Sequence, residues 1–234
     1  RASNGWHDPP MMLDALEHET GPQPQRCLII LHGLGADGSD FEPVCQMLAR
    51  DLADLGPLRF VLPSAPVMPV SINGGYRMRA WYDIRPAGVA EREDPVTMRA
   101  SLQAVNALID REVARGVPPE GIVVMGFSQG CAMALLAGLR YPQRLAGLVA
   151  LSGYLPLPET TEAERHAANL HTPVFMGHGD ADGVVPTVRG QQAYAVLSRL
   201  GQPVEWHDYP IDHSVCEDEI DDIATWLRRV WSST

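Results

Sequence analysis

The segment Gly126-Phe127-Ser128-Gln129-Gly130 constrains this chain more than any other stretch of it. It joins an apolar run at residues 122–125, typical of a buried strand, to a run of small and apolar residues at 131–137, typical of a helix. A turn this tight leaves no room for side chains beside the backbone, which explains the two glycines. The same turn would expose the Ser128 hydroxyl at the end of a sheet, where it can act as a nucleophile. The alternative is a tight turn whose serine has no chemical role.

Strand-like and helix-like segments alternate along the chain, which predicts an α/β fold. Strands are expected at residues 12–20, 27–31, 59–62, 122–125, 147–151, 174–176 and 204–209. Helices are expected at residues 40–55, 95–115, 131–137, 191–200 and around the apolar positions 220–230. The alternation predicts one domain, residues 11–234, with a mostly parallel central sheet and helices on both of its faces. Residues 1–10 are expected to be disordered or derived from a tag.

Charge and cysteine usage limit the partners and the compartment. A net charge of −11 argues against nucleic acid and against anionic membrane surfaces, which require basic patches. No apolar stretch approaches the length of about 18 residues that a membrane span needs, and the first residues lack the apolar core of a signal peptide. The cysteines, Cys27, Cys45, Cys131 and Cys216, have no zinc-type spacing and are expected to be free thiols. We therefore expect a cytoplasmic protein that acts on a small molecule.

A serine nucleophile needs a base to take its proton, and the base needs an acid to orient it. In parallel α/β sheets such residues collect beyond the carboxyl ends of the strands. His213 follows the strand at 204–209 and is the favoured base, whereas His207 lies inside that strand and is expected to face solvent or a helix. Asp180 and Asp182 both follow the strand at 174–176, and the residues alone do not choose between them. The order Ser, Asp, His along the chain is that of α/β hydrolases.

The same residues have alternative interpretations. Asp180 and Asp182 could cap a loop, and His213 could be an ordinary surface histidine. His178 beside these aspartates could indicate a metal, but no supporting ligand set is found elsewhere in the sequence, so no metal or cofactor is predicted.

Acyl transfer also needs donors for the oxyanion of the tetrahedral intermediate. One is expected to be the backbone N–H of Gln129, and the second that of Leu34, in the loop that follows the strand at 27–31. Residues 33–38 also match the dinucleotide-binding pattern GxGxxG. That fold needs an acid at the end of the next strand, and the strand at 59–62 is followed by Pro63-Ser64-Ala65 instead. The helix is also expected to begin only at Asp40, beyond the glycines.

Two irregular stretches interrupt the alternation of strands and helices. Residues 63–94 contain several prolines and the Gly74-Gly75 pair, and a loop of this length inside a compact domain is usually functional. Residues 154–172 begin with a proline-rich segment, 154–158, which is expected to alter the rim of a pocket.

Several motifs of this chain recur together, in the same order, in a known family. They are Leu31 to Gly38, Phe60 to Pro66, Asn73-Gly74-Gly75, Trp81-Tyr82-Asp83, Gly126 to Gly130, and the neighbourhoods of Asp180 and His213. From about Met12 to its end the chain resembles the phospholipase/carboxylesterase family, which includes acyl-protein thioesterases and small bacterial carboxylesterases.

The resemblance implies an α/β-hydrolase fold without metal or cofactor. It implies Ser128 as nucleophile, His213 as base and Asp182, the second aspartate of its loop, as the acid. Leu34 and Gln129 take the oxyanion role, and Trp81 and Val185 are expected to contact the substrate, with Asn73 and Trp81 on a loop that helps to form an acyl groove. The equal alternative for Trp81 is an anchor in the core or in this loop. Cys131 departs from the glycine of many relatives, but it is small enough for the helix to pack closely.

The predicted function is therefore hydrolysis of carboxylic esters with short to medium acyl chains through an acyl-enzyme. The acidic surface favours small soluble esters over anionic lipid interfaces. The alternative is an acyl-protein thioesterase or lysophospholipase that acts on long chains. More remote alternatives are a dinucleotide-binding oxidoreductase at residues 33–38 and a non-catalytic hydrolase scaffold that only binds. The resemblance is also compatible with a homodimer.

Overall fold

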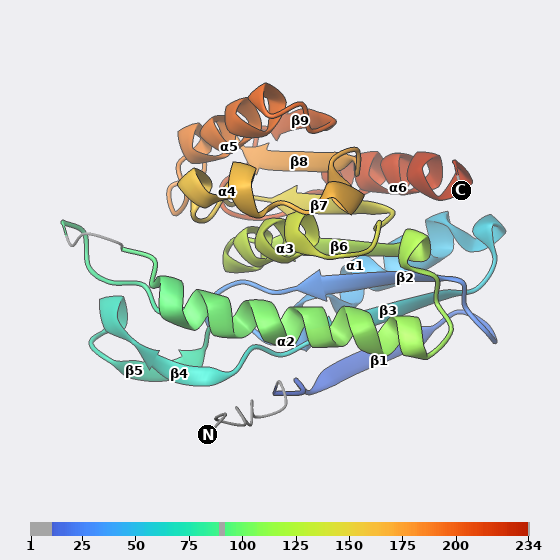
Figure 1. The fold of residues 1–234 in the computed structure, drawn as a ribbon, viewed down its shortest axis with the longest axis horizontal. Helices are drawn as coiled ribbons and strands as arrows, with labels where there is room; N and C mark the ends of the chain where they lie inside the picture. Colours follow the sequence, from blue (N-terminus) through green and yellow to red (C-terminus); the bar gives the residue numbers. More distant parts are fainter. Residues whose placement is uncertain (1–10, 89–91, 234) are drawn as a thin grey trace, which may run out of the picture.

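The computed structural model describes residues 11–88 and 92–233, and the expectation for residues 1–10 lies outside this part of the chain (Figure 1). A central sheet of seven strands in the order β1-β3-β2-β6-β7-β8-β9 runs through the described residues. Only β1 is antiparallel to its neighbour. The strands of this sheet are β1 (Ala15–Glu19), β2 (Arg26–Leu31), β3 (Leu58–Pro63), β6 (Ile122–Phe127), β7 (Gly147–Leu151), β8 (Val174–Gly179) and β9 (Val204–Tyr209). The mostly parallel sheet predicted from the sequence is confirmed.

Helices cover both faces of the sheet, as expected (Figure 1). They are α1 (Glu42–Asp51), α2 (Pro95–Ala114), α3 (Gln129–Arg140), α4 (Pro158–Glu164), α5 (Thr187–Arg199) and α6 (Glu217–Ser232). Alternate strand residues enter two separate cores: Ile29 and Val124 pack with α2 and α3, whereas Ile30 and Met125 pack with α1 and α6. Because both faces are buried, the strands appear in the sequence as continuous apolar runs.

The region predicted as one helix at 40–55 is divided into three parts. Asp37, rather than Asp40, caps its start, since its side chain accepts a hydrogen bond of 2.8 Å from the Ser39 N–H. A 3₁₀ turn at 38–41 precedes α1, and a second one at 53–55 follows it. Asp40 therefore lies inside the first turn, and the α-helix begins two residues beyond it.

The stretch at 63–94 contains regular structure that the sequence did not reveal. Strands β4 (Val67–Val70) and β5 (Tyr76–Arg79) form an antiparallel hairpin apart from the main sheet (Figure 1). Each strand has four residues and β4 contains Pro69, so the alternation was too short and too interrupted to be recognised.

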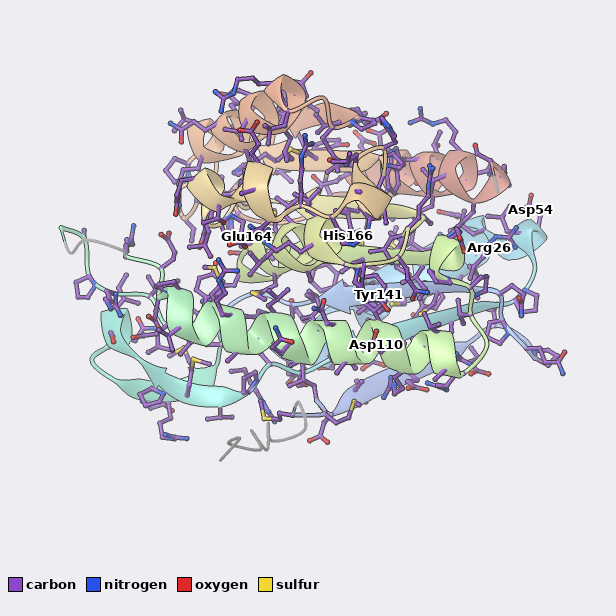
Figure 2. The ribbon with its side chains drawn as sticks, viewed as in Figure 1. Arg26, Asp54, Asp110, Tyr141, Glu164 and His166 are labelled. Atoms are coloured by element: carbon purple, nitrogen blue, oxygen red, sulfur yellow. The ribbon has the colours of Figure 1, made fainter. Side chains whose placement is uncertain are left out.

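The proline-rich stretch after β7 contains α4, which ion pairs hold in place. Glu164 accepts hydrogen bonds of 2.7 Å from Arg99 of α2 and of 2.8 Å from Arg140 of α3. Nearby, Tyr141 donates a hydrogen bond of 2.6 Å to Asp110 of α2 (Figure 2). The Glu164 contacts fix the segment that leads from the carboxyl end of β7 to the start of β8.

Candidate active site

Ser128 occupies the sharp turn between β6 and α3 with φ 57° and ψ −116°, a conformation that side-chain-bearing residues rarely adopt. A Cβ on Gly126 would lie 1.9 Å from the carbonyl oxygen of Gly130. A Cβ on Gly130 would lie 1.9 Å from the carbonyl oxygen of Leu31. Both positions therefore require glycine, and the strained turn that they permit is the one expected for an exposed nucleophile.

Asp182 and His213 are directly hydrogen-bonded. The Nδ1 of His213 lies 2.7 Å from Oδ2 of Asp182, and the acceptor role of the carboxylate makes Nδ1 the donor. The other oxygen, Oδ1, accepts hydrogen bonds of 2.9 Å from the N–H groups of Val184 and Val185. The Asp182 side chain is fully buried, whereas Asp180 is exposed. The structure thus brings Asp182 to His213 and leaves Asp180 in solvent.

Backbone contacts hold the loops of Asp182 and His213 together. A Cβ on Gly179, at the end of β8, would lie 2.2 Å from the Asp212 carbonyl oxygen, so only glycine allows this approach. The Ala181 N–H donates a hydrogen bond of 3.1 Å to the Ile211 carbonyl. His178 is buried and adds a hydrogen bond of 2.9 Å between its Nε2 and the Val185 carbonyl. The distance between acid and imidazole is therefore set by the backbone.

Ser128 and His213 line one cavity of about 440 Å³, within the usual size of ligand sites. The other predicted site residues that line it are Leu34, Gln129 and Val185. The His213 ring packs against the ring of Phe127, with centroids 4.8 Å apart. Asn73, Ile72 and Ile84 also line the cavity, so the long stretch after β3 contributes to its wall.

Two backbone N–H groups predicted to bind an oxyanion lie at the cavity without a backbone acceptor among the described residues. Gln129 is the first residue of α3, and its N–H has no acceptor within the helix. In the loop after β2, the Gly35 and Ala36 N–H groups bond to the carbonyls of Arg79 and Gly33. No backbone acceptor for the Leu34 N–H is found within residues 11–88 and 92–233. Leu34 and Gln129 both border the cavity, which is where the predicted oxyanion role would require them.

His32 supports this loop, a role that sequence reasoning missed. Its buried ring donates a hydrogen bond of 2.6 Å from Nδ1 to the Gly33 carbonyl and accepts one of 2.9 Å at Nε2 from the Ala65 N–H. Burial lowers the pKa of His32, which favours the neutral ring that this pattern needs. A polar residue at the end of an apolar strand, directly before the Gly33-Leu34-Gly35 loop, is the feature that could have indicated it.

Trp81 lies behind the cavity rather than in its lining. It is fully buried, and its indole N–H donates a hydrogen bond of 2.8 Å to the His32 carbonyl. The Gln129 side chain accepts a hydrogen bond of 2.9 Å from the Trp81 N–H and donates one of 2.8 Å to the Tyr82 carbonyl. Trp81 therefore takes the alternative position, an anchor in the core, where it and the Gln129 side chain hold the backbone around residues 32 and 81–82.

The remaining candidates lie elsewhere. His207 is on β9, stacked on Phe175 at 4.5 Å and bonded to Glu205 at 3.0 Å. Gly33 and Gly35 precede a 3₁₀ turn that begins at Gly38, and the α-helix begins only at Glu42. These glycines therefore do not form the helix N-terminus of a dinucleotide site. Among the described residues, no three His, Cys, Asp or Glu side chains are grouped to hold a metal, and no helix is long and apolar enough to cross a bilayer.

Similarity to known proteins agrees with this geometry. The profile of the Phospholipase/Carboxylesterase family matches residues 17–231. Acyl-protein thioesterase 1 of Gibberella zeae is 37% identical over 210 residues, which cover 86% of this chain and 89% of that protein. Acyl-protein thioesterase 1 of Saccharomyces cerevisiae is 36% identical over 218 residues, which cover 90% and 96%.

Solved structures show the same fold. The crystal structure of Arabidopsis thaliana SOBER1 has a TM-score of 0.81 and 31% identity, and it covers 88% of this chain and 99% of that one. The crystal structure of esterase PE8 has a TM-score of 0.78 and 28% identity, with coverage of 94% and 100%. The chain belongs to the phospholipase/carboxylesterase family and is a serine hydrolase with the α/β-hydrolase fold.

Proposed function

We propose that this protein hydrolyses thioesters and esters of long acyl chains, in the manner of an acyl-protein thioesterase, with Ser128, His213 and Asp182 as its catalytic triad. The hydrogen bond between Asp182 and His213, at the cavity that also exposes Ser128, is the observation that carries the assignment of these roles. The sequence favoured short to medium acyl chains. The similarity to acyl-protein thioesterases instead supports the long-chain alternative.

The proposed reaction has two steps. His213 Nε2 accepts the Ser128 proton as the hydroxyl oxygen attacks the acyl carbonyl, and the resulting oxyanion binds the N–H groups of Leu34 and Gln129. His213 then protonates the leaving thiolate or alkoxide, which leaves an acyl-enzyme. Water, deprotonated by the same imidazole, releases the acid and regenerates Ser128. Asp182 stays ionised and holds Nδ1 protonated throughout.

The cavity wall is suited to an acyl chain close to the reacting carbonyl. Ile72, Ile84 and Val184 line it, and Ile72 and Val184 are exposed to solvent at its mouth, at 38% and 70%. Burial of methylene groups against such side chains supplies affinity without requiring specific polar contacts.

Activity on a matched series of acyl thioesters and p-nitrophenyl esters tests the proposal. We expect hydrolysis of dodecanoyl and palmitoyl thioesters, and covalent labelling of Ser128 by a fluorophosphonate probe. In Ser128→Ala, labelling should vanish and kcat should fall roughly 10⁴- to 10⁶-fold with an unchanged Tm. Near-normal hydrolysis by that variant would refute the assignment, and activity on butyryl esters alone would favour the short-chain esterase.

One observation favours that second function. Arg189 and Glu93 also line the cavity and bring charge to one end of it, which limits the apolar length open to a chain. A cavity closed there would suit short to medium acyl groups.

We also propose a cytoplasmic location. The four cysteines are free, and burial raises the pKa of Cys45 and of Cys131 to about 12, so these thiols are poorly reactive. Free thiols are typical of a reducing compartment. Cell fractionation tests this, and recovery of the protein outside the cytoplasmic fraction would overturn it.

A further inference from the structure

A second cavity of about 370 Å³ adjoins the catalytic one. The two cavities share three lining residues, Glu93, Tyr154 and Arg189, which therefore form a partition between them. Most of the rest of the second lining is apolar and comes from α2, the segment 155–158 and α5, with Met98 and Val196 as its larger helix residues. The side of the catalytic cavity that faces the second cavity is therefore bounded by Glu93, Tyr154 and Arg189.

The partition consists of Tyr154, which a buried hydrogen bond holds in place, and of the ion pair between Arg189 and Glu93. Tyr154 is buried, and its hydroxyl is hydrogen-bonded to that of Tyr82. The Arg189 guanidinium carbon lies 3.6 Å from the centroid of the Tyr154 ring, and Nη1 lies 2.9 Å from Oε1 of Glu93. The Arg189 side chain is 34% exposed and that of Glu93 is 22% exposed. Ion pairs so close to solvent are weak, so Arg189 can leave its position while Tyr154 stays.

We propose that the second cavity is a subsite for the distal part of a long acyl chain, and that the Arg189–Glu93 pair is the gate between the two cavities. The inference rests on the proposed function of Ser128 and extends it to chain-length specificity. With the pair closed, the enzyme accepts chains that fit the catalytic cavity. With the pair open, the chain continues past Tyr154 into the apolar space beyond.

The energetic balance favours opening by long chains. Each methylene group that moves from water into an apolar site improves binding about fourfold. A few additional methylene groups therefore offset the loss of a partly exposed ion pair and of the arginine–tyrosine contact. Recognition of an anionic substrate by Arg189 is disfavoured, because Glu93 already balances its charge.

The test compares kcat/KM for p-nitrophenyl dodecanoate and butyrate, expressed as a ratio. We expect Arg189→Ala to raise this dodecanoate-to-butyrate ratio about tenfold, because the gate is removed. Glu93→Gln should raise it about threefold, because it weakens the pair and keeps the shape. Val196→Phe fills the second cavity, so its addition to Arg189→Ala should cancel the gain.

Arg228→Ala is the matched control. Arg228 pairs with Asp54 at the end of the molecule opposite the carboxyl ends of the strands (Figure 2), and its loss should leave the ratio unchanged. Melting temperatures establish that each variant is folded. If Arg189→Ala does not fold, the ratio measured for Glu93→Gln tests the proposal.

Each outcome bears on one proposal. Unchanged ratios in both gate variants, with butyrate hydrolysis retained, would overturn the gate and leave the proposed function standing. Selective loss of activity on an ester of a dicarboxylic acid in Arg189→Ala would assign Arg189 to charge recognition instead. Absence of esterase activity in the wild-type protein would refute the proposed function itself.

Discussion

Two regions of the active site are built in different ways. The floor consists of the loops after β2, β6, β8 and β9, which carry Leu34, Ser128, Asp182 and His213, and close backbone approaches hold it in place. The wall comes from Ile72, Asn73, Ile84 and Glu93 in the stretch after β3, and from Tyr154 and Arg189. Its partition depends on side-chain contacts near solvent. Displacing the floor requires breaking buried hydrogen bonds, whereas the partition can rearrange at small cost. The backbone therefore fixes the geometry of the proposed reaction, whereas substrate preference can change one side chain at a time.

The largest effect should come from Asp182 in the floor, compared with Asp180 in the same loop. In Asp182→Asn the amide NH₂ replaces one of the two acceptor oxygens, so it must face either the Nδ1–H of His213 or the N–H groups of Val184 and Val185. Because two donors then oppose each other, the imidazole loses its orientation. We expect kcat to fall about 10⁴-fold with little change in KM. Asp180→Asn is the matched control, and it should stay within about threefold of the wild type because Asp180 is exposed. A larger loss in the control would transfer the acid role to Asp180.

The second effect concerns the free energy of unfolding and its dependence on the buried carboxyl group of Glu219. Glu219, on the first turn of α6, is fully buried, and both its carboxylate oxygens lack a hydrogen-bond partner among the described residues. One of them would lie 3.1 Å from a Cβ on Gly177 of β8. Burial, assisted by the charge of Asp222, raises the pKa of Glu219 to about 8. By contrast Glu112, equally buried, is paired with Arg59 at 2.6 Å.

Because the folded pKa of Glu219 exceeds the unfolded value, the folded state holds a proton that the unfolded state releases. The stability from this proton is complete below about pH 4.5 and is lost as the pH rises to about 8. Glu219→Gln removes this dependence. Its free energy of unfolding, relative to the wild type, should therefore rise by about 3 kcal/mol between pH 5.5 and pH 8.

Urea unfolding at the two pH values measures this change. Glu217→Gln, an exposed substitution on the same turn, should show no such difference. An equal pH dependence in wild type and Glu219→Gln would mean that the carboxyl is solvated or paired in solution.

The smallest effect belongs to the wall. Tyr82→Phe removes the hydroxyl that holds Tyr154 in the partition and should lower the free energy of unfolding by about 1 kcal/mol. It should also raise the dodecanoate-to-butyrate ratio about twofold, since Tyr154 becomes less restrained. Tyr141→Phe removes the hydrogen bond from buried Tyr141 to exposed Asp110 of α2, away from the cavities, and should leave this ratio unchanged. Equal ratios in the two variants would show that Tyr82 does not support the partition.

The sequence predicts the floor well because its determinants are local. Continuous apolar runs mark strands buried on both faces, and the glycines beside Ser128 mark a turn that tolerates no side chain. The strand-end rule placed Asp182 and His213 at one edge of the sheet, and their hydrogen bond lies there. The choice of Asp182 over Asp180 came only from the family resemblance, because both aspartates follow the same strand.

The wall was not predictable in the same way. The β4–β5 hairpin consists of short strands with an internal proline, and α4 lies within a proline-rich stretch, so neither shows a clear periodicity. The burial of Trp81 depends on partners far along the chain, His32 and Gln129, which no local pattern connects to it. The pairing of Arg189 with Glu93 is likewise purely tertiary.

The strand order places the members of the proposed triad at unequal depth in the sheet. Ser128 follows β6, which has β2 and β7 as neighbours, whereas His213 follows β9, an outermost strand. Outer strands open locally more readily than central ones, and their amide protons exchange sooner with solvent. A brief opening of β9 would carry the imidazole away while the serine turn stays intact. Heating should therefore abolish turnover reversibly, several degrees before the protein loses its overall structure.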